Sequence, residues 1–205
     1  MNYTTLAAAE IISKTMEGLK ARNIESEVVN TKEEALAKIK ELVPAGASVM
    51  NGASVTLEEI GLIDYLKSDT HGWNNLHAGI VAEKDPAKQA QLRKEANLSD
   101  YYFGSVHAIT EEGEMVIASN TGSQLPHLVF TSSNLILVVG TQKIVPTLAD
   151  ALNRLEMHVI PLEDKHMQSL YGVGTHKNKT LIFHGESSLT KRSVKVLFVK
   201  EPVGF

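Results

Sequence analysis

A run of apolar residues between Asn134 and Gly140, read as NLILVVG, constrains the fold of this sequence most strongly. Uninterrupted leucine, isoleucine and valine over the length of one strand predict a strand that is buried on both faces. A polar segment, Gly140-Thr141-Gln142-Lys143, follows directly, and Pro146 then opens a predicted helix. Because open α/β sheets bind ligands at the carboxyl ends of their strands, the run predicts both an α/β fold and a candidate site.

The segment before this strand predicts an antiparallel hairpin. Two short β-like runs, Val106 to Ile109 and Glu114 to Ala118, are joined by a turn that ends at Gly113. A polar loop, Ser119 to Gln124, leads from the hairpin toward the buried strand. We therefore expect a largely parallel sheet, flanked by helices, with one antiparallel hairpin.

The first third of the chain alternates between helical and strand patterns, as α/β proteins do. Two Thr-x-x-Glu patterns, Thr31 to Glu34 and Thr56 to Glu59, have capping-box spacing and predict helix starts. The expected elements are a helix at 6–19, a strand at 26–29, a helix ending at 42, a strand at 48–50 and a helix ending at 66.

The remaining elements are predicted from shorter patterns. Residues 70–83 are expected to form an irregular loop with a strand at 79–82, and Asp85-Pro86 predicts the start of a helix that reaches Asn97. Further along, we expect a helix at 145–155, a strand at 159–160, a helix at 162–170, and strands at 181–183 and 194–199 that complete the sheet.

Composition limits the classes of function. At 205 residues and 43% hydrophobic content, residues 1–205 fit a single domain that buries roughly 70% of its unfolded surface. A net charge of −4 and no aromatic-basic stripe argue against nucleic acid as a partner. Met1 to Leu19 has neither a basic leader nor an apolar core, and no run approaches the ~20 apolar residues of a membrane helix. We therefore expect a cytoplasmic protein without membrane attachment.

Residue types exclude several chemistries. The chain has no cysteine, which excludes disulfides, a thiolate nucleophile and cysteine-ligated iron–sulfur clusters. The eight histidines lack zinc-ligand spacing, so no metal site is predicted. Gly172 and Gly174 supply only two glycines of a dinucleotide fingerprint, and neither a G-x-S-x-G elbow nor a phosphate-binding loop is present.

Three polar loops are candidates for a ligand site. In the first, Asn51, Gly52, Ser54 and Thr56 lie between a strand and a helix, where backbone N–H groups and hydroxyls suit a phosphate or carboxylate. Simple helix capping by Thr56 and Glu59 is the alternative. Another of the three loops follows the buried strand and contains Gly140, Thr141 and Lys143. Lys143 could pair with an anionic group of a ligand; the alternative is an ordinary solvated lysine.

The remaining loop joins the hairpin to the buried strand. Gly122 permits a turn that directs neighbouring amides to one point, and Gln124 offers both a donor and an acceptor. An ordinary surface loop is the alternative. The candidate residues here are Asn120, Thr121, Gly122, Ser123 and Gln124.

Acidic residues offer no assigned catalytic group. Glu58, Glu59 and Glu186 could transfer protons, and His184 lies close to Glu186 in sequence. Each carboxylate also has a structural explanation, including an ion pair between Glu186 and Lys191 or Arg192. We therefore predict no catalytic residue.

The order of these segments resembles a known family. AITEEGEMVIASNTGSQ followed by LILVVGTQKIVPTLADAL is similar to the LUD domain of lactate-utilisation proteins, and residues 47–62, 84–102 and 196–205 extend the resemblance. The resemblance implies a fold like that of NagB/RpiA/CoA transferase-like proteins and a role in the oxidation of L-lactate or related organic acids. It also implies a small-residue ligand element at Thr121-Gly122.

Together these observations predict a LUD-like domain that binds a small anionic molecule, either a small organic acid or an anionic cofactor or sugar derivative. A non-redox subunit is favoured, with an iron–sulfur oxidoreductase or a second copy of the chain in a homo-oligomer as its partner. A stand-alone isomerase or transferase acting on a phosphosugar or CoA ester is the first alternative. A non-catalytic sensor or scaffold is the second, and the cofactor is unknown.

Overall fold

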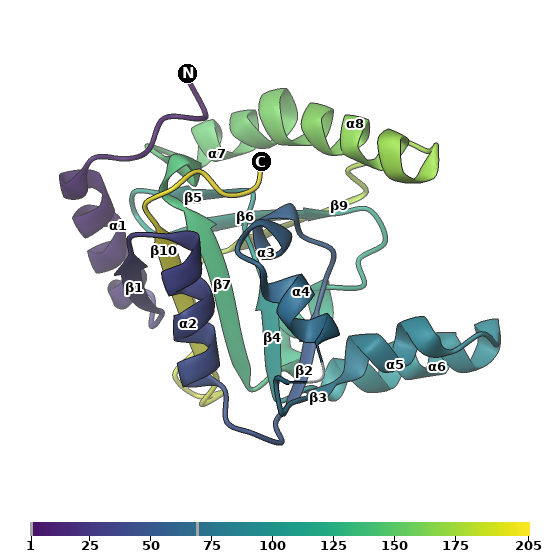
Figure 1. Ribbon diagram of the computed structural model, residues 1–205. Helices are drawn as coiled ribbons and strands as arrows, with labels where there is room; N and C mark the ends of the chain where they lie inside the picture. The colour runs from purple at the N-terminus through teal and green to yellow at the C-terminus, as the bar shows by residue number, and fades with distance from the viewer. Residues whose placement is uncertain (1, 69) are drawn as a thin grey trace.

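β7 (Asn134–Gly140) lies inside a six-stranded parallel sheet of the order β1-β10-β7-β4-β2-β3 (Figure 1). The computed structural model describes residues 2–68 and 70–205; Met1, the start of the segment inspected for a leader, lies outside them. The other strands are β1 (Glu25–Val29), β2 (Ser48–Asn51), β3 (Asn74–Asn75), β4 (Tyr101–Gly104) and β10 (Ser193–Val199). Leu137 of β7 packs on one face and Val138 on the other, which confirms the strand buried on both sides.

A second sheet packs against the first. It has the order β8-β5-β6-β9, formed by β8 (Ile144–Val145), β5 (Ala108–Thr110), β6 (Met115–Ser119) and β9 (Lys179–Phe183). β5 and β6 form the predicted antiparallel hairpin. The expectation that residues 181–183 complete the main sheet was wrong, because β9 pairs antiparallel with β6 instead.

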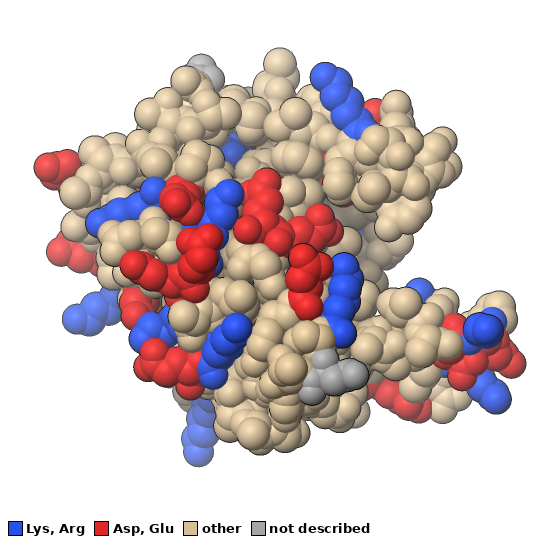
Figure 2. Space-filling model, viewed as in Figure 1, with Lys and Arg blue, Asp and Glu red and all other residues tan. Residues whose placement is uncertain are grey.

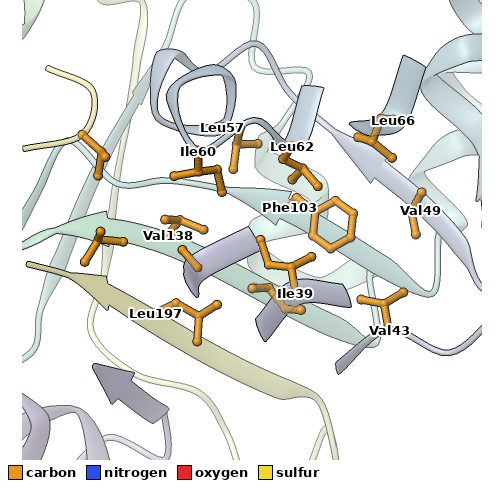
Figure 3. Packing of buried hydrophobic residues seen from close by; sticks show 14 of the residues in the cluster. Ile39, Val43, Val49, Leu57, Ile60, Leu62, Leu66, Phe103, Val138 and Leu197 are labelled. Atoms are coloured by element: carbon orange, nitrogen blue, oxygen red, sulfur yellow. The ribbon is translucent and has the colours of Figure 1, made fainter. Parts of the chain in front are cut away.

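The elements form four layers, in which the two sheets pack face to face between two layers of helices. α2 (Lys32–Leu42), α3 (Val55–Glu59) and α4 (Leu62–Lys67) cover one face of the main sheet, where Ile39, Leu57 and Leu62 pack toward Phe103 and Val138 (Figure 3). The second sheet and α1 (Ala9–Ala21) cover the other face. α7 (Leu148–Arg154) and α8 (Ile160–Tyr171) close the outer face of the second sheet.

α5 (Leu76–Ala82) and α6 (Pro86–Glu95) project from the body as an arm (Figure 1). The predicted strand at 79–82 was wrong, because the Asn75 side chain accepts a hydrogen bond from the Ala78 amide and starts a helix there. α6 begins as expected, with Asp85 as its N-cap and Pro86 in its first turn.

The predicted elements between 145 and 160 also need correction. Val145 belongs to β8, and the helix begins only after Thr147, whose side chain accepts from the Asp150 amide. The predicted strand at 159–160 is helical, since a π-helical segment, Leu155–Val159, joins α7 to α8. Pro161 lies in the first turn of α8 and has no N–H to donate to the preceding turn, which accounts for the widened π-helical turn before it. None of the helices among the described residues is long and apolar enough to span a bilayer.

Candidate functional site

A cavity of about 320 Å³ opens where the parallel strands end. Because β2, β4 and β7 run parallel, the loops at their carboxyl ends meet at one edge of the sheet, and the end of β6 joins them from the second sheet. Eight of the residues predicted as ligand contacts line the cavity: Gly52, Ser54, Thr56, Asn120, Thr121, Ser123, Gln124 and Lys143.

The other four predicted contacts lie outside this lining. Asn51 is buried and its amide donates to the Gly52 carbonyl oxygen, 3.1 Å away. Thr141 is 1% exposed and lies behind the wall with Gly140. Gly122 has a φ of 86°, so it shapes the loop rather than facing the cavity.

Lys143 is a buried basic residue in the cavity lining. It is 3% exposed, and its Nζ donates to Thr56 Oγ1 at 2.9 Å and to Ser105 Oγ at 3.2 Å. Among the described residues, no carboxylate oxygen lies within 4.0 Å of Nζ. Burial and, to a smaller extent, the charge of Arg154 lower the pKa of Lys143 to about 7, while the charge of Glu59 opposes the shift. An ordinary solvated lysine is therefore ruled out.

The helix start at α3 explains why Thr56 is available to Lys143. Ser54, rather than Thr56, is the N-cap of α3, and its Oγ accepts from the Leu57 amide at 3.4 Å. Glu59 does not complete a capping box, because its Oε2 accepts from the Gly204 amide at 2.8 Å. The capping prediction for Thr56 and Glu59 was wrong, and the displaced hydroxyl holds the lysine instead.

A second buried cation, Arg154, lies behind the cavity. Its side chain is fully buried, and Nη1 donates to the carbonyl oxygens of His107 and Phe205. Nε and Nη2 have no hydrogen-bond partner among the described residues. Burial lowers the pKa of Arg154 to about 10, so the group stays charged at neutral pH and adds positive potential beside Lys143.

His107 is neutral at physiological pH. Burial, followed by the charges of Lys143 and Arg154, lowers its pKa to about 3. Its Nδ1 lies 3.0 Å from the Ala118 amide nitrogen, which donates to it. The proton of the neutral ring is therefore on Nε2, and His107 offers the cavity wall a dipole rather than a charge.

Among the described residues, the cavity lining contains one acidic side chain. Glu163 of α8 lines the cavity, and burial raises the pKa of its carboxyl group. Lys177, also in the lining, pairs with Glu156. On the face shown in Figure 2, by contrast, acidic and basic side chains lie close together. Ion pairs outside the cavity include those of Lys38 with Glu27 and of Lys67 with Asp64. The inner cavity thus favours an anion.

Several lining residues were missed by the sequence analysis. Tyr102 and Ser105 come from β4 and the segment after it, and β4 had no predicted strand of its own. The run of three aromatic residues, Tyr101 to Phe103, was the available signal, because aromatic residues are enriched in strands. Met167, His176 and Phe205 reach the cavity only through tertiary packing.

The fold and the cavity define an α/β protein with a positively charged pocket at the carboxyl edge of its parallel sheet. The sequence matches the LUD domain over residues 12–199, and the chain belongs to this family.

A crystal structure of a DUF162 family protein from Deinococcus radiodurans has a similar fold, with a TM-score of 0.58 and 14% sequence identity. The similarity covers 95% of this chain and 99% of that one. No curated protein sequence matches the chain.

Proposed function

We propose that this LUD-domain protein binds a small organic acid in the cavity and serves as a non-redox subunit in the utilisation of L-lactate or a related organic acid. The observation that carries the proposal is Lys143, a buried lysine that faces the cavity without a counterion among the described residues. A ligand carboxylate would provide that counterion and would be held by a charge-assisted hydrogen bond.

The size and charge of the cavity support this class of ligand. Its volume of about 320 Å³ is at the lower end of the range of small-molecule sites, ~300–1,000 Å³. Arg154 adds a second positive charge nearby, and the neutral His107 avoids a third. The non-redox role follows from the absence of cysteine, because cluster ligation would then require another polypeptide, such as an iron–sulfur oxidoreductase.

One observation favours a second candidate, a stand-alone isomerase or transferase acting on a phosphosugar or CoA ester. With a pKa of about 7, Lys143 is present in both protonation states at neutral pH, which is the property of an efficient general acid or base. Turnover by the isolated protein, followed by NMR, separates this candidate from a binding subunit.

The test is a thermal-shift panel followed by isothermal titration. The panel contains lactate, glycolate, CoA esters, sugar phosphates and folates, and a ligand at 100 times its Kd should stabilise the protein by about 2.7 kcal/mol. Lys143→Met should lower the affinity by about a hundredfold or more, since it removes the charged partner. Lys67→Met, which changes an exposed lysine paired with Asp64, is the matched control. Equal binding by Lys143→Met and the wild type would contradict the proposal.

A further inference from the structure

The hydroxyl of Tyr102 is a buried donor without an acceptor. Tyr102 lies on β4, is 1% exposed and lines the cavity. Its oxygen has no hydrogen-bond partner among the described residues. Burial raises the pKa of this phenol, and the nearby Gly52 amide lowers it by a smaller amount, so the proton stays on the oxygen at physiological pH. Because an amide N–H can only donate, the phenol proton still lacks an acceptor.

Tyr102 is not free to turn toward another partner. Its ring stacks on His127 with the centroids 4.4 Å apart and the planes 16° from parallel. His127 is fixed in turn, since its Nδ1 lies 2.9 Å from Ser132 Oγ and 3.4 Å from Ser99 Oγ. A buried hydroxyl without a hydrogen-bond partner lowers the stability of the protein. A rigid site that holds such a hydroxyl at a cavity therefore points to a ligand group as its partner.

An acceptor lies close to this donor. The Gln124 side chain donates from Nε2 to the Ala118 carbonyl oxygen at 3.0 Å, which fixes the amide and leaves its Oε1 free to accept. The two oxygens converge at Gly52: a Cβ added there would lie 2.7 Å from the Tyr102 oxygen and 3.3 Å from Gln124 Oε1. Because Gly52 has no side chain, the donor and the acceptor both approach its backbone closely, and the three residues together form one corner of the cavity lining.

A donor and an acceptor at one point select between functional groups. A ligand hydroxyl can accept from Tyr102 and donate to Gln124 at the same time. A carbonyl oxygen can only accept, and would face the lone pairs of Gln124 Oε1. A hydrogen atom or methyl group would leave both protein groups unpaired, which sites of this kind reject strongly.

We infer that the corner formed by Gly52, Tyr102 and Gln124 recognises a hydroxyl group of the anion that Lys143 binds. The ligand class is thus a hydroxylated anion, either a hydroxy carboxylic acid or a polyol phosphate. The inference rests on the proposed function for the anionic group, and it adds the specificity. Tyr102 and Gln124 contact the ligand, whereas His127 positions Tyr102.

Isothermal titration with matched ligands tests this inference. The first set is L-lactate, propionate and pyruvate, which differ at the second carbon in having a hydroxyl, a hydrogen and a carbonyl; glycerol 3-phosphate and inorganic phosphate form the second. For the wild type, we expect the hydroxylated member of one set to bind at least about tenfold more tightly than the others of that set. The preferred set distinguishes the carboxylate source from the phosphate source.

Three variants test whether Tyr102 and Gln124 cause the preference for the hydroxylated ligand. Tyr102→Phe keeps the ring on His127 and should bring the members of the preferred set to within about threefold of each other. Gln124→Leu should do the same, and it provides the test if Tyr102→Phe fails to fold. Tyr101→Phe makes the identical change on the preceding residue of β4, which packs on the opposite face of the sheet, and should keep the full preference.

The outcomes separate this inference from the proposed function. If Lys143→Met abolishes binding but the wild type does not prefer the hydroxylated anion, the corner is not a hydroxyl site and the proposed function stands. A preference that survives in both Tyr102→Phe and Gln124→Leu overturns the inference in the same way. If no anion in either set binds the wild type, both proposals fail.

Discussion

Two cations are buried at opposite ends of β7, and their surroundings differ completely. Arg192 lies just before β10, beside the amino end of β7, and its Nη1 is 2.9 Å from Glu186 Oε2. Both side chains are only 5% exposed. Its remaining groups donate to the carbonyl oxygens of Ser132 and His127, each at 2.9 Å. Lys143, at the carboxyl end, donates to two hydroxyl oxygens and to no other acceptor in the part of the chain that the structure describes.

The comparison separates a structural charge from a functional one. Arg192 has its counterion and its acceptors inside the protein, so the fold completes its environment. Lys143 has no such counterion among the described residues, and burial makes its charged form costly. A protein that keeps an uncompensated charge in a cavity keeps it for chemistry or binding rather than for stability.

Removing the counterion of Arg192 should have the largest effect. Glu186→Gln leaves the guanidinium buried without its charge partner, which should lower the free energy of unfolding by about 3 kcal/mol. Urea denaturation at pH 7 measures the change. Glu25→Gln is the control, because it removes an exposed partner of Lys195 and should change stability by less than about 1 kcal/mol. Similar losses in the two variants would break the comparison.

Removing Lys143 should act in the opposite direction and depend on pH. The pKa of Lys143 is about 7 in the folded protein against 10.5 for a free lysine, so the unfolded chain binds more protons between these values. The free energy of unfolding of the wild type should therefore rise with pH, relative to Lys143→Met, by about 2–3 kcal/mol between pH 7 and 9.

Denaturation curves of both proteins at several pH values test this slope. Lys67→Met should follow the wild type at every pH, since it alters only an exposed ion pair. Parallel curves for the wild type and Lys143→Met would show that Lys143 titrates normally, and the contrast with Arg192 would lose its basis.

Binding of an anion should be accompanied by protonation of the Lys143 amine. Without ligand, the amine is mostly neutral at pH 8; an adjacent anion raises its pKa, so binding should take up close to one proton. At pH 5.5 the amine is already charged, and the uptake should vanish. Titrations in two buffers of different ionisation enthalpy measure the number of protons. Uptake that is equal at both pH values would assign the protons to another group.

The smallest expected effect concerns the loop beside the cavity. Gly122 has a φ of 86°, and an added Cβ would lie 2.7 Å from the flexible side chain of Lys179. Gly122→Ala should therefore weaken binding of the anion about tenfold, or ~1.4 kcal/mol, through the geometry of the neighbouring residues while the fold stays intact. Thr121→Val should weaken it less. Wild-type affinity in both variants, measured by titration, would make this loop purely structural.

The two ends of β7 were not equally predictable from the sequence. The uninterrupted apolar run predicted the buried strand, and parallel strands bring the loops after β2 and β7 to one edge. The pairing of Glu186 with Arg192 was one of the alternatives that the sequence left open. The elements at 79–82 and 159–160 were misplaced because their apolar patterns are too short to distinguish a strand from a helix. At the first, the Asn75 cap starts a helix; at the second, the chain is helical up to Pro161 in the first turn of α8.

The sequence by itself determined the layered α/β class and the chemical content of the three loops, because periodicity and chain order are properties of neighbouring residues. Tertiary structure alone decided that Lys143 is buried, that Thr56 holds it rather than capping α3, and that Tyr102 faces Gln124 across Gly52. Burial and the shift in pKa that it causes depend on residues up to 87 positions apart in the chain, such as Thr56 and Lys143. No local pattern encodes that distance.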